Sequence, residues 1–282
     1  NRGESPSGLL GLQYKLASKL VFDKVKDALG LDQARIAVTA AAPISAEVLE
    51  FFAGFDLPVY EVYGQSEGTG PTTFNRPGFA KFGTVGPPYP GTEVKVADDG
   101  EILLKGGNVF AGYYKNEEST NETLAEGWLY SGDLGSFDAN GFLTITGREK
   151  DIIITAGGKN IAPKNLEAGL KDHPLISEAV VIGDRRKYLT VLVTLDAEGL
   201  EAYAAEHDIE GDPHEAEQVR AEVQSALDAV NAKVARVEQI KKFTILPREL
   251  TIEDGELTGT LKVKRNVVAD HFHAEIEKMY AD

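Results

Sequence analysis

The sequence predicts a mixed α/β (α+β) fold that ends in a second, smaller α/β domain, and three observations support this fold class. Helical and strand-like segments alternate in the first part of the chain, as they do around parallel sheets. Residues 83–146 instead contain short strands separated by Gly, Asn-Gly and Asp-Gly turns, which is typical of a small β subdomain. Helices and strands alternate again over residues 150–282, a length within the usual range of a domain.

The first part of the chain, residues 1–149, opens with a helical pattern. Apolar residues recur at helical spacing in "LLGLQYKLASKLVFDKVKDALG", and Gly30 is a suitable C-terminal cap. "RIAVTA" then indicates a strand, "ISAEVLEFFAGF" a helix that Ser45 caps, and "PVYEVYG" another strand. This order predicts a parallel sheet. The β subdomain follows, with strands at "TEVKVA", "EILLKG" and "FLTITG".

The last part of the chain begins with an apolar run and a helix that Pro163 opens. "EAVVIGD" and "YLTVLVTL" indicate strands, and helices are expected near 197–207 and 214–234, on either side of the acidic loop "DIEGDP". A final helix should contain His271 and His273. Because residues two apart point to different sides of a helix, these histidines are poor partners for a metal. No histidine is assigned a catalytic role.

Composition excludes several classes of function. The chain has 45 acidic and 29 basic residues, and its formal charge of −16 opposes long-range attraction to nucleic-acid backbones or anionic membranes. A hydrophobic content of 42% over 282 residues is sufficient for proper cores. The absence of cysteine excludes disulfides, thiolate–metal sites and catalysis through a protein-bound thioester. We therefore expect small-molecule substrates and no nucleic acid.

No run of residues approaches the roughly 20 apolar residues that a membrane span requires. The N-terminal "NRGESPSGLLGLQYK" lacks the basic start and apolar core of a signal peptide. A cytoplasmic protein is therefore expected. Peripheral contact with a membrane and the oligomeric state stay open.

Three segments carry chemically informative residues in a defined order. They are "YGQSEGTG" (63–70), "YSGD" (130–133) continuing into "GREKDIIITAGGKNIAPKNLE" (147–167), and "ELTGTLKVKR" (256–265). Together with "EILLKGGNVFAGYYKNEEST", they resemble successive core motifs of the acyl-adenylate-forming (AMP-forming) ligases, most closely the C-terminal part of long-chain fatty acyl-CoA synthetases. The order and spacing agree over essentially the whole chain, so this resemblance is far more specific than a single glycine loop.

The resemblance implies a ligase that uses a fatty acid, ATP, Mg²⁺ and CoA. The first half-reaction would give acyl-AMP and pyrophosphate, and the second would transfer the acyl group to CoA and release AMP. In the first, a carboxylate attacks the α-phosphate of ATP, and positioned positive charge has to offset the repulsion between two anions. A lysine in a partly dry site and a metal held by a carboxylate would supply that charge.

Lys262, in "TLKVKR", stands where the resemblance places the adenylation lysine, which contacts the acyl carboxylate and the phosphate. From composition alone, Lys262, Lys264 and Arg265 would simply begin the solvated face of the last helix. Two positions depart from the family pattern. Leu261 stands where many relatives have Gly, and Gly259 stands where long-chain relatives often have Pro.

Glu67 follows a predicted strand at the C-terminal edge of the sheet, where open α/β sheets bind ligands. With the resemblance, it is the expected Mg²⁺ ligand, and Ser66 would hydrogen-bond a phosphate oxygen. Tyr63 and Gly64 would lie beside the adenine and the acyl carbonyl. An exposed Glu in a turn is the plainer interpretation of Glu67.

Asp133 is an acceptor-only group suited to both ribose hydroxyls, although Asp also commonly opens turns. Arg148 would contact the ribose or the α-phosphate from the opposite side, and its plainer interpretation is a surface arginine. Ala41, Ala42 and Pro43 follow a strand and resemble the segment that lines the adenine. A simple strand-to-helix loop fits these three residues equally well.

The opening of the last domain has a second role in the resembling family. The resemblance implies that this domain rotates about a hinge at Lys150 after acyl-AMP forms, which would withdraw Lys262 and bring "TAGGKN" to the acyl carbonyl. Gly157 and Gly158 would then border the pantetheine tunnel of CoA, because the absence of Cβ permits close approach. A β-turn without a ligand is the alternative for these two glycines.

Members of the family also carry a phosphate loop upstream of the first motif, and this chain does not contain it. The sequence is therefore expected to be the C-terminal part of a synthetase, and whether it is active alone stays open. Two alternatives stay open. One is a ligase that delivers the acyl group to a carrier protein, and the other is a catalytically silent nucleotide-binding fragment.

Overall fold

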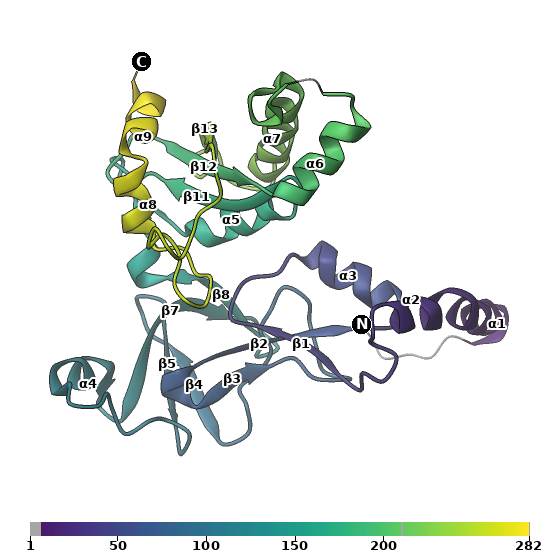
Figure 1. Ribbon diagram of the computed structural model, residues 1–282. Helices are drawn as coiled ribbons and strands as arrows, with labels where there is room; N and C mark the ends of the chain where they lie inside the picture. The colour runs from purple at the N-terminus through teal and green to yellow at the C-terminus, as the bar shows by residue number, and fades with distance from the viewer. Residues whose placement is uncertain (1–6, 210, 282) are drawn as a thin grey trace. The chain divides into compact units, whose positions relative to one another are not determined.

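In the computed structural model of the chain, residues 7–209 and 211–281 are described. The first residues and the centre of the predicted acidic loop lie outside this part. The chain divides into two compact units, Asn1–Lys150 and Asp151–Asp282, each of which is described by itself (Figure 1). Both units combine helices and sheets, so the mixed α/β fold class is confirmed.

The predicted N-terminal helix forms, but it is not regular. A π-helical turn η1 (Ser18–Phe22) lies between α1 (Gly8–Ala17) and α2 (Asp23–Ala28), and Gly30 ends the segment with a φ of +68°. None of its described residues is buried. Most of its leucines are exposed, among them Leu9, Leu12, Leu16 and Leu20.

The first sheet of unit 1 has the order β1-β2-β3. Strands β1 (Ala37–Ala40) and β2 (Val59–Gln65) are parallel, as predicted, and α3 (Ala46–Gly54) connects them. Strand β3 (Gly70–Phe74), which the sequence did not indicate, pairs antiparallel with β2. Between β2 and β3 lies the 3₁₀ turn η2 (Ser66–Gly68).

The β subdomain of unit 1 is a five-stranded sheet. Its order is β4-β5-β7-β6, and β8 pairs with β7. The bounds are β4 (Thr92–Val96), β5 (Glu101–Gly106), β6 (Leu124–Ala125), β7 (Trp128–Phe137) and β8 (Leu143–Arg148), with α4 (Glu117–Thr123) preceding β6. Strands β4, β5 and β8 were predicted, whereas the short β6 and β7, the longest, were not. Ile102 and Leu143 of this sheet are fully buried beside Tyr63 of β2.

Unit 2 begins at Asp151, the last residue of the 3₁₀ turn η3 (Glu149–Asp151). Its first strands, β9 (Ile153–Ile154) and β10 (Asn160–Ile161), form a small hairpin. Its main sheet has the order β11-β12-β13, with β12 antiparallel to β11 and parallel to β13. The remaining bounds are α5 (Pro163–Lys171), β11 (Ile176–Ile182), β12 (Leu189–Leu195), α6 (Ala197–Glu206), the 3₁₀ turn η4 (Pro213–Glu215), α7 (Glu217–Asn231), β13 (Ile240–Ile245), α8 (Arg265–His271) and α9 (His273–Tyr280).

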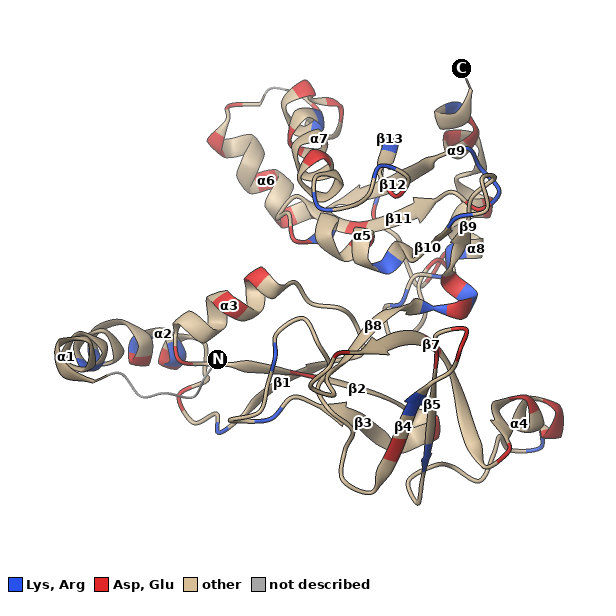
Figure 2. Cartoon of the chain, turned by 180° about the vertical axis from the view of Figure 1, so that it is seen from behind, with Lys and Arg blue, Asp and Glu red and all other residues tan. Residues whose placement is uncertain are grey.

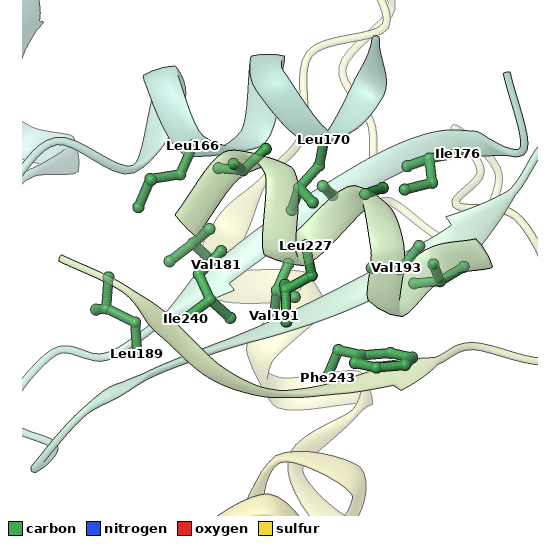
Figure 3. Close-up of a cluster of buried hydrophobic side chains, with 14 of the residues drawn as sticks. Leu166, Leu170, Ile176, Val181, Leu189, Val191, Val193, Leu227, Ile240 and Phe243 are labelled. Carbon is green, nitrogen blue, oxygen red and sulfur yellow. The ribbon is translucent and has the colours of Figure 1, made fainter. Parts of the chain in front are cut away.

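The sheet of unit 2 has a hydrophobic core on each face, because successive strand residues point to opposite sides. Val181 faces Leu170 of α5 and Leu227 of α7 in the first core, which Figure 3 shows. The neighbouring Val180 belongs to a second core with Val268 of α8 and residues of α9. This three-layer packing fixes both ends of unit 2 to one sheet.

The predicted final helix is interrupted, which corrects the sequence interpretation. Phe272 has φ −106° and ψ 29°, so α8 ends at His271 and α9 begins at His273. The Phe272 side chain is buried in the second core. Among the residues that the structure describes, no group of His, Cys, Asp and Glu side chains is arranged to hold a metal ion.

In Figure 2, which colours the ribbon by residue type, acidic residues occur along α4 and α6, in agreement with the negative net charge. Within residues 7–209 and 211–281, no helix is both long enough and apolar enough to cross a membrane.

Candidate functional site

The Glu67 turn reverses the chain between β2 and β3 and presents polar groups at the end of β2. A Cβ on Gly64 would overlap the carbonyl oxygen of Gly70, so this crossing requires glycine. The turn continues through Thr69, which has a φ of +56°. Ser66 is exposed and Glu67 is partly exposed. Both side chains are therefore accessible to a ligand.

A segment far along the chain braces this turn. The Tyr113 hydroxyl donates to Glu67 Oε1 at 2.7 Å, and this bond raises the pKa of Tyr113. The Phe110 N–H donates to the Glu67 carbonyl oxygen at 2.8 Å. The side-chain amide of Asn108 donates to the Gly68 carbonyl oxygen at 2.9 Å. Sequence reasoning assigned no role to these residues, although they lie in the quoted stretch that resembles the family motifs.

Asp133 and Arg148 are directly opposite each other on the antiparallel strands β7 and β8. Arg148 Nε lies 3.5 Å from Asp133 Oδ1, and the Tyr63 hydroxyl donates to Asp133 Oδ2 at 2.9 Å. Burial, and secondly the charge of Asp133, raise the pKa of Tyr63. Glu101 accepts a 2.8 Å hydrogen bond from the Gly132 N–H and so supports the turn beside Asp133. Sequence reasoning missed the contribution of Glu101.

Strand β2 connects the two polar pairs, because its Tyr63 bonds Asp133 and Glu67 lies in the turn that follows it. The charge of Arg148 lowers the pKa of Tyr63 and that of Tyr113 against the larger effects that raise both. The Arg148 side chain is 47% exposed, whereas the Asp133 side chain is 17% exposed. Unit 1 therefore brings an accessible cation together with two carboxylates from separate motifs, a composition suited to a phosphate-bearing ligand with hydroxyl groups.

The segment Ala41–Pro43 forms an exposed connection between β1 and α3. Ala41 has a φ of +74°, a conformation that is uncommon for residues with a side chain. Small side chains here leave the backbone open to a flat group. The loop itself is equally compatible with having no ligand.

In unit 2, Lys262 is exposed and lies in a short hairpin in which Leu257 pairs with Val263. Leu261 has a φ of +60°, the left-handed region that favours glycine. This conformation suits the glycine that the family resemblance leads us to expect at this position. Arg265 does not belong to a solvated face, because its guanidinium donates to the Val181 carbonyl oxygen at 2.8 Å.

Gly157 and Gly158 lie in the exposed turn of the β9–β10 hairpin. The Gly158 N–H donates to the Thr155 carbonyl oxygen at 2.8 Å, and Gly158 has a φ of +72°. Lys150 is exposed in η3, at the end of unit 1. These positions are consistent with both interpretations of the glycines.

Comparison with known proteins matches both units to one family. Residues 11–114 match the family model of the AMP-binding enzymes, and residues 150–282 match the model of the AMP-binding enzyme C-terminal domain. The chain is 44% identical over 284 residues to the long-chain-fatty-acid–CoA ligase FadD15 of Mycobacterium bovis. That alignment covers 98% of this chain and 46% of FadD15, so the chain spans about half the length of the curated relatives it matches.

Two solved structures illustrate the shared fold. The adenylation domain of a carboxylate reductase from Mycobacterium chelonae has a TM-score of 0.72 and 24% identity, covering 95% of this chain and 42% of that one. The o-succinylbenzoate coenzyme A synthetase of Bacillus subtilis, in complex with ATP and magnesium, has a TM-score of 0.63 and 27% identity. It covers 82% of this chain and 46% of its own.

Proposed function

The chain belongs to the AMP-binding enzymes, and on that premise we propose that it is the C-terminal half of a long-chain fatty acid–CoA ligase. The ligase converts a fatty acid and ATP to acyl-AMP and pyrophosphate, and then transfers the acyl group to CoA with release of AMP. The similarity to FadD15, a long-chain-fatty-acid–CoA ligase, supports this choice of acid and acceptor. The observation that carries the proposal is that β2 links two of the motifs in unit 1: Tyr63 in β2 bonds Asp133, which faces Arg148, and Glu67 lies in the turn that follows β2.

The proposed roles of the two units follow the positions of the family matches. Unit 1 is the C-terminal portion of the large adenylation domain, and unit 2 is the small mobile domain. Lys150 is the hinge between them. Its exposed side chain and its short 3₁₀ turn leave the backbone there few packing constraints.

The nucleotide site lies in unit 1. Asp133 accepts hydrogen bonds from the ribose hydroxyls, and Arg148 contacts the ribose or the α-phosphate. Ala41, Ala42 and Pro43 line the adenine. Tyr63, whose hydroxyl already bonds Asp133 Oδ2, holds the carboxylate in place beside the nucleotide.

Glu67 and Ser66 interact with the phosphates of ATP, Glu67 through Mg²⁺ and Ser66 directly. Mg²⁺ is usually bound by one or two carboxylates together with substrate phosphates and water, so a single partly exposed glutamate is a fitting donor. The metal would neutralise phosphate charge there. Ser66 donates to a phosphate oxygen. Gly64 lies beside the acyl carbonyl, and it must be glycine because a Cβ there would overlap the backbone of Gly70.

Unit 2 contributes to both half-reactions. Lys262 contacts the acyl carboxylate and the phosphate during adenylation, and its exposure leaves the ammonium accessible for this. Gly157 and Gly158 border the pantetheine of CoA in the second half-reaction. Their exposed turn, without Cβ atoms, permits the close approach that a narrow tunnel needs.

Fatty-acid-dependent exchange of labelled pyrophosphate into ATP tests this function. We would measure it with Mg²⁺ and acids of several lengths, first on the 282-residue chain and then on the chain joined to upstream sequence of its natural parent. Asp133→Asn should abolish the exchange, whereas Asp98→Asn, at an exposed position of the same unit, should not. Exchange that does not respond to fatty acids in either protein would contradict the proposal.

A further inference from the structure

Lys262 lies in a short hairpin whose base is formed by Glu256 and Lys264. The Lys264 N–H donates to the Glu256 carbonyl oxygen at 2.7 Å, and the Thr258 N–H donates to the Lys262 carbonyl oxygen at 2.8 Å. At the tip, the Leu261 N–H donates to the Thr258 carbonyl oxygen at 2.9 Å. The position of the Lys262 backbone therefore depends on what holds the base of this hairpin.

The carboxylate of Glu256 is completely buried, and several donors surround it. Arg248 provides two N–H groups at 2.7 Å each, one to each carboxylate oxygen. The Thr251 N–H donates to Oε2 at 3.0 Å, and His271 Nδ1 lies 3.0 Å from Oε1. The Arg248 bonds, more than any other interaction, lower the pKa of Glu256 to about 2. The Glu256 side chain is thus ionised, and both of its carboxylate oxygens accept hydrogen bonds that hold it in one position.

The partners of Glu256 come from different parts of unit 2. Arg248 follows β13, and His271 is the last residue of α8. Beside Glu256, Leu257 is buried in the second hydrophobic core, and Val263 packs against the same core. One end of the hairpin is therefore tied to the sheet, to a helix and to the core.

The tip of the hairpin is held by local bonds within itself: Thr258 Oγ1 accepts from the Lys262 N–H at 3.0 Å and from the Thr260 N–H at 3.3 Å. Gly259, Thr260, Leu261 and Lys262 are exposed, and Leu261 is in the left-handed region of φ. Within residues 7–209 and 211–281, no group bonds the Lys262 ammonium. The contacts at the base of the hairpin consequently determine the orientation of its tip.

We propose that Glu256 is a positioning residue for Lys262: its buried carboxylate fixes the base of the hairpin and so sets where the lysine ammonium is presented. This inference rests on the adenylation role proposed for Lys262. The simpler alternative is that Glu256 and Arg248 only stabilise unit 2 as a whole. The two ideas differ in which amides respond when the carboxylate is neutralised.

Amide hydrogen exchange of the 282-residue chain separates these ideas. Glu256→Gln should speed exchange over residues 258–264 by about tenfold or more, because hydrogen bonds to a buried charge are lost. Amides of β11 and β12 should exchange at wild-type rates and show that the variant is folded. Glu253→Gln, an exposed glutamate of the same loop, is the matched control and should change neither region.

Arg248→Gln removes the main donor and provides an independent variant. It should speed exchange in the same residues, and the double variant should add little to either single variant because both act on one interaction. Unchanged exchange over 258–264 in folded Glu256→Gln overturns the proposal. Equal acceleration throughout unit 2 overturns it as well, since that result indicates a purely structural role.

Activity of the chain joined to its upstream sequence supplies the second readout. Glu256→Gln should lower kcat for pyrophosphate exchange at least about tenfold while KM for ATP changes less than about twofold. Thioester formation from supplied acyl-AMP should stay intact. If Lys262→Ala leaves pyrophosphate exchange unchanged, the role proposed for Lys262 is wrong, and with it the proposal that Glu256 positions a catalytic lysine. The amide hydrogen exchange over residues 258–264 would then still show independently whether Glu256 fixes the hairpin.

Discussion

The Tyr113 hydroxyl donates a 2.7 Å hydrogen bond to the carboxylate of Glu67, across 46 positions of sequence. This bond fixes one rotamer of the side chain that we propose as the Mg²⁺ ligand. The Tyr113 ring also packs edge-on against Phe110, whose N–H bonds the Glu67 carbonyl oxygen. The backbone and side chain of Glu67 are thus held by one neighbouring segment.

Tyr113→Phe should therefore weaken the use of Mg²⁺ without unfolding unit 1. A hydrogen bond to a charged group contributes about 1.5 kcal/mol or more, so the Mg²⁺ concentration for half-maximal pyrophosphate exchange should rise about tenfold. Tyr114→Phe is the matched control, because Tyr114 is 88% exposed and the Lys115 ammonium lies over its ring, which the substitution keeps. Equal Mg²⁺ dependence in the two variants would argue against positioning by Tyr113.

Lys262→Ala should abolish acyl-AMP formation and leave thioester formation from supplied acyl-AMP largely intact. The reason is that the ammonium is needed only where two anions approach each other in the first half-reaction. The neighbouring Lys264→Ala is the control, since Lys264 is also exposed in the same segment. Equal loss in both half-reactions would show that the lysine is not specific to adenylation.

Lys150→Pro should have the opposite bias. Proline restricts φ at the proposed hinge, so we expect thioester formation to fall more than adenylation. Lys150→Ala removes the side chain without restricting the backbone and should resemble wild type. Separate assays of the two half-reactions decide the matter, and unimpaired thioester formation in Lys150→Pro would exclude a hinge at this residue.

Local sequence signals predicted many elements correctly, because the decisive chemistry lies within a few residues. Ser45 caps α3 by accepting a hydrogen bond from the Val48 N–H, and Pro163 occupies the first turn of α5. Strands β11 and β12 were visible as apolar runs, since most of their residues are buried. For these elements the local signal and the tertiary environment agree.

The missed elements depend on partners that are distant in the sequence. Strand β7 contains Gly132, Gly135 and polar motif residues, and only its pairing with β5 and β8 makes it the central strand of its subdomain. The candidate site shows the same limit. Motifs indicated Asp133 and Glu67, but the hydroxyls of Tyr63 and Tyr113 reach them across 70 and 46 positions. Spacing along the chain cannot reveal such contacts.

Arg265→Lys should destabilise unit 2 by about 2 kcal/mol, because lysine cannot reproduce the forked geometry of the guanidinium. Arg265 bonds the carboxylate of Glu167 and the Val181 carbonyl oxygen, while Glu167 Oε1 accepts from the Val181 N–H at 2.8 Å. These contacts join α8, α5 and β11. Faster amide exchange throughout β11 would be the observable effect, and Arg185→Lys, at a side chain 93% exposed, should have none.

Stability of unit 1 should fall as the pH rises toward 8, and Glu61 is the cause. Its side chain is buried on β2 and accepts a 2.9 Å hydrogen bond from the Gly83 N–H. Burial raises the pKa of Glu61 from 4.5 to about 7. The folded state therefore holds this proton more tightly than the unfolded state. The resulting stability is fully present below about pH 4.5 and is lost as the pH rises through about 7.

Glu61→Gln removes this titration, so the free energy of unfolding of wild type should fall relative to the variant between pH 5 and 8, by an amount on the order of 3 kcal/mol. Trp128 is the single tryptophan of the chain and lies in β7, so its fluorescence during urea unfolding reports on unit 1 alone. For Glu50→Gln, at an exposed position of α3, the free energy of unfolding should change with pH as it does in wild type. If the free energy of unfolding of Glu61→Gln also changed with pH as it does in wild type, Glu61 would ionise as readily in the folded unit as in the unfolded chain.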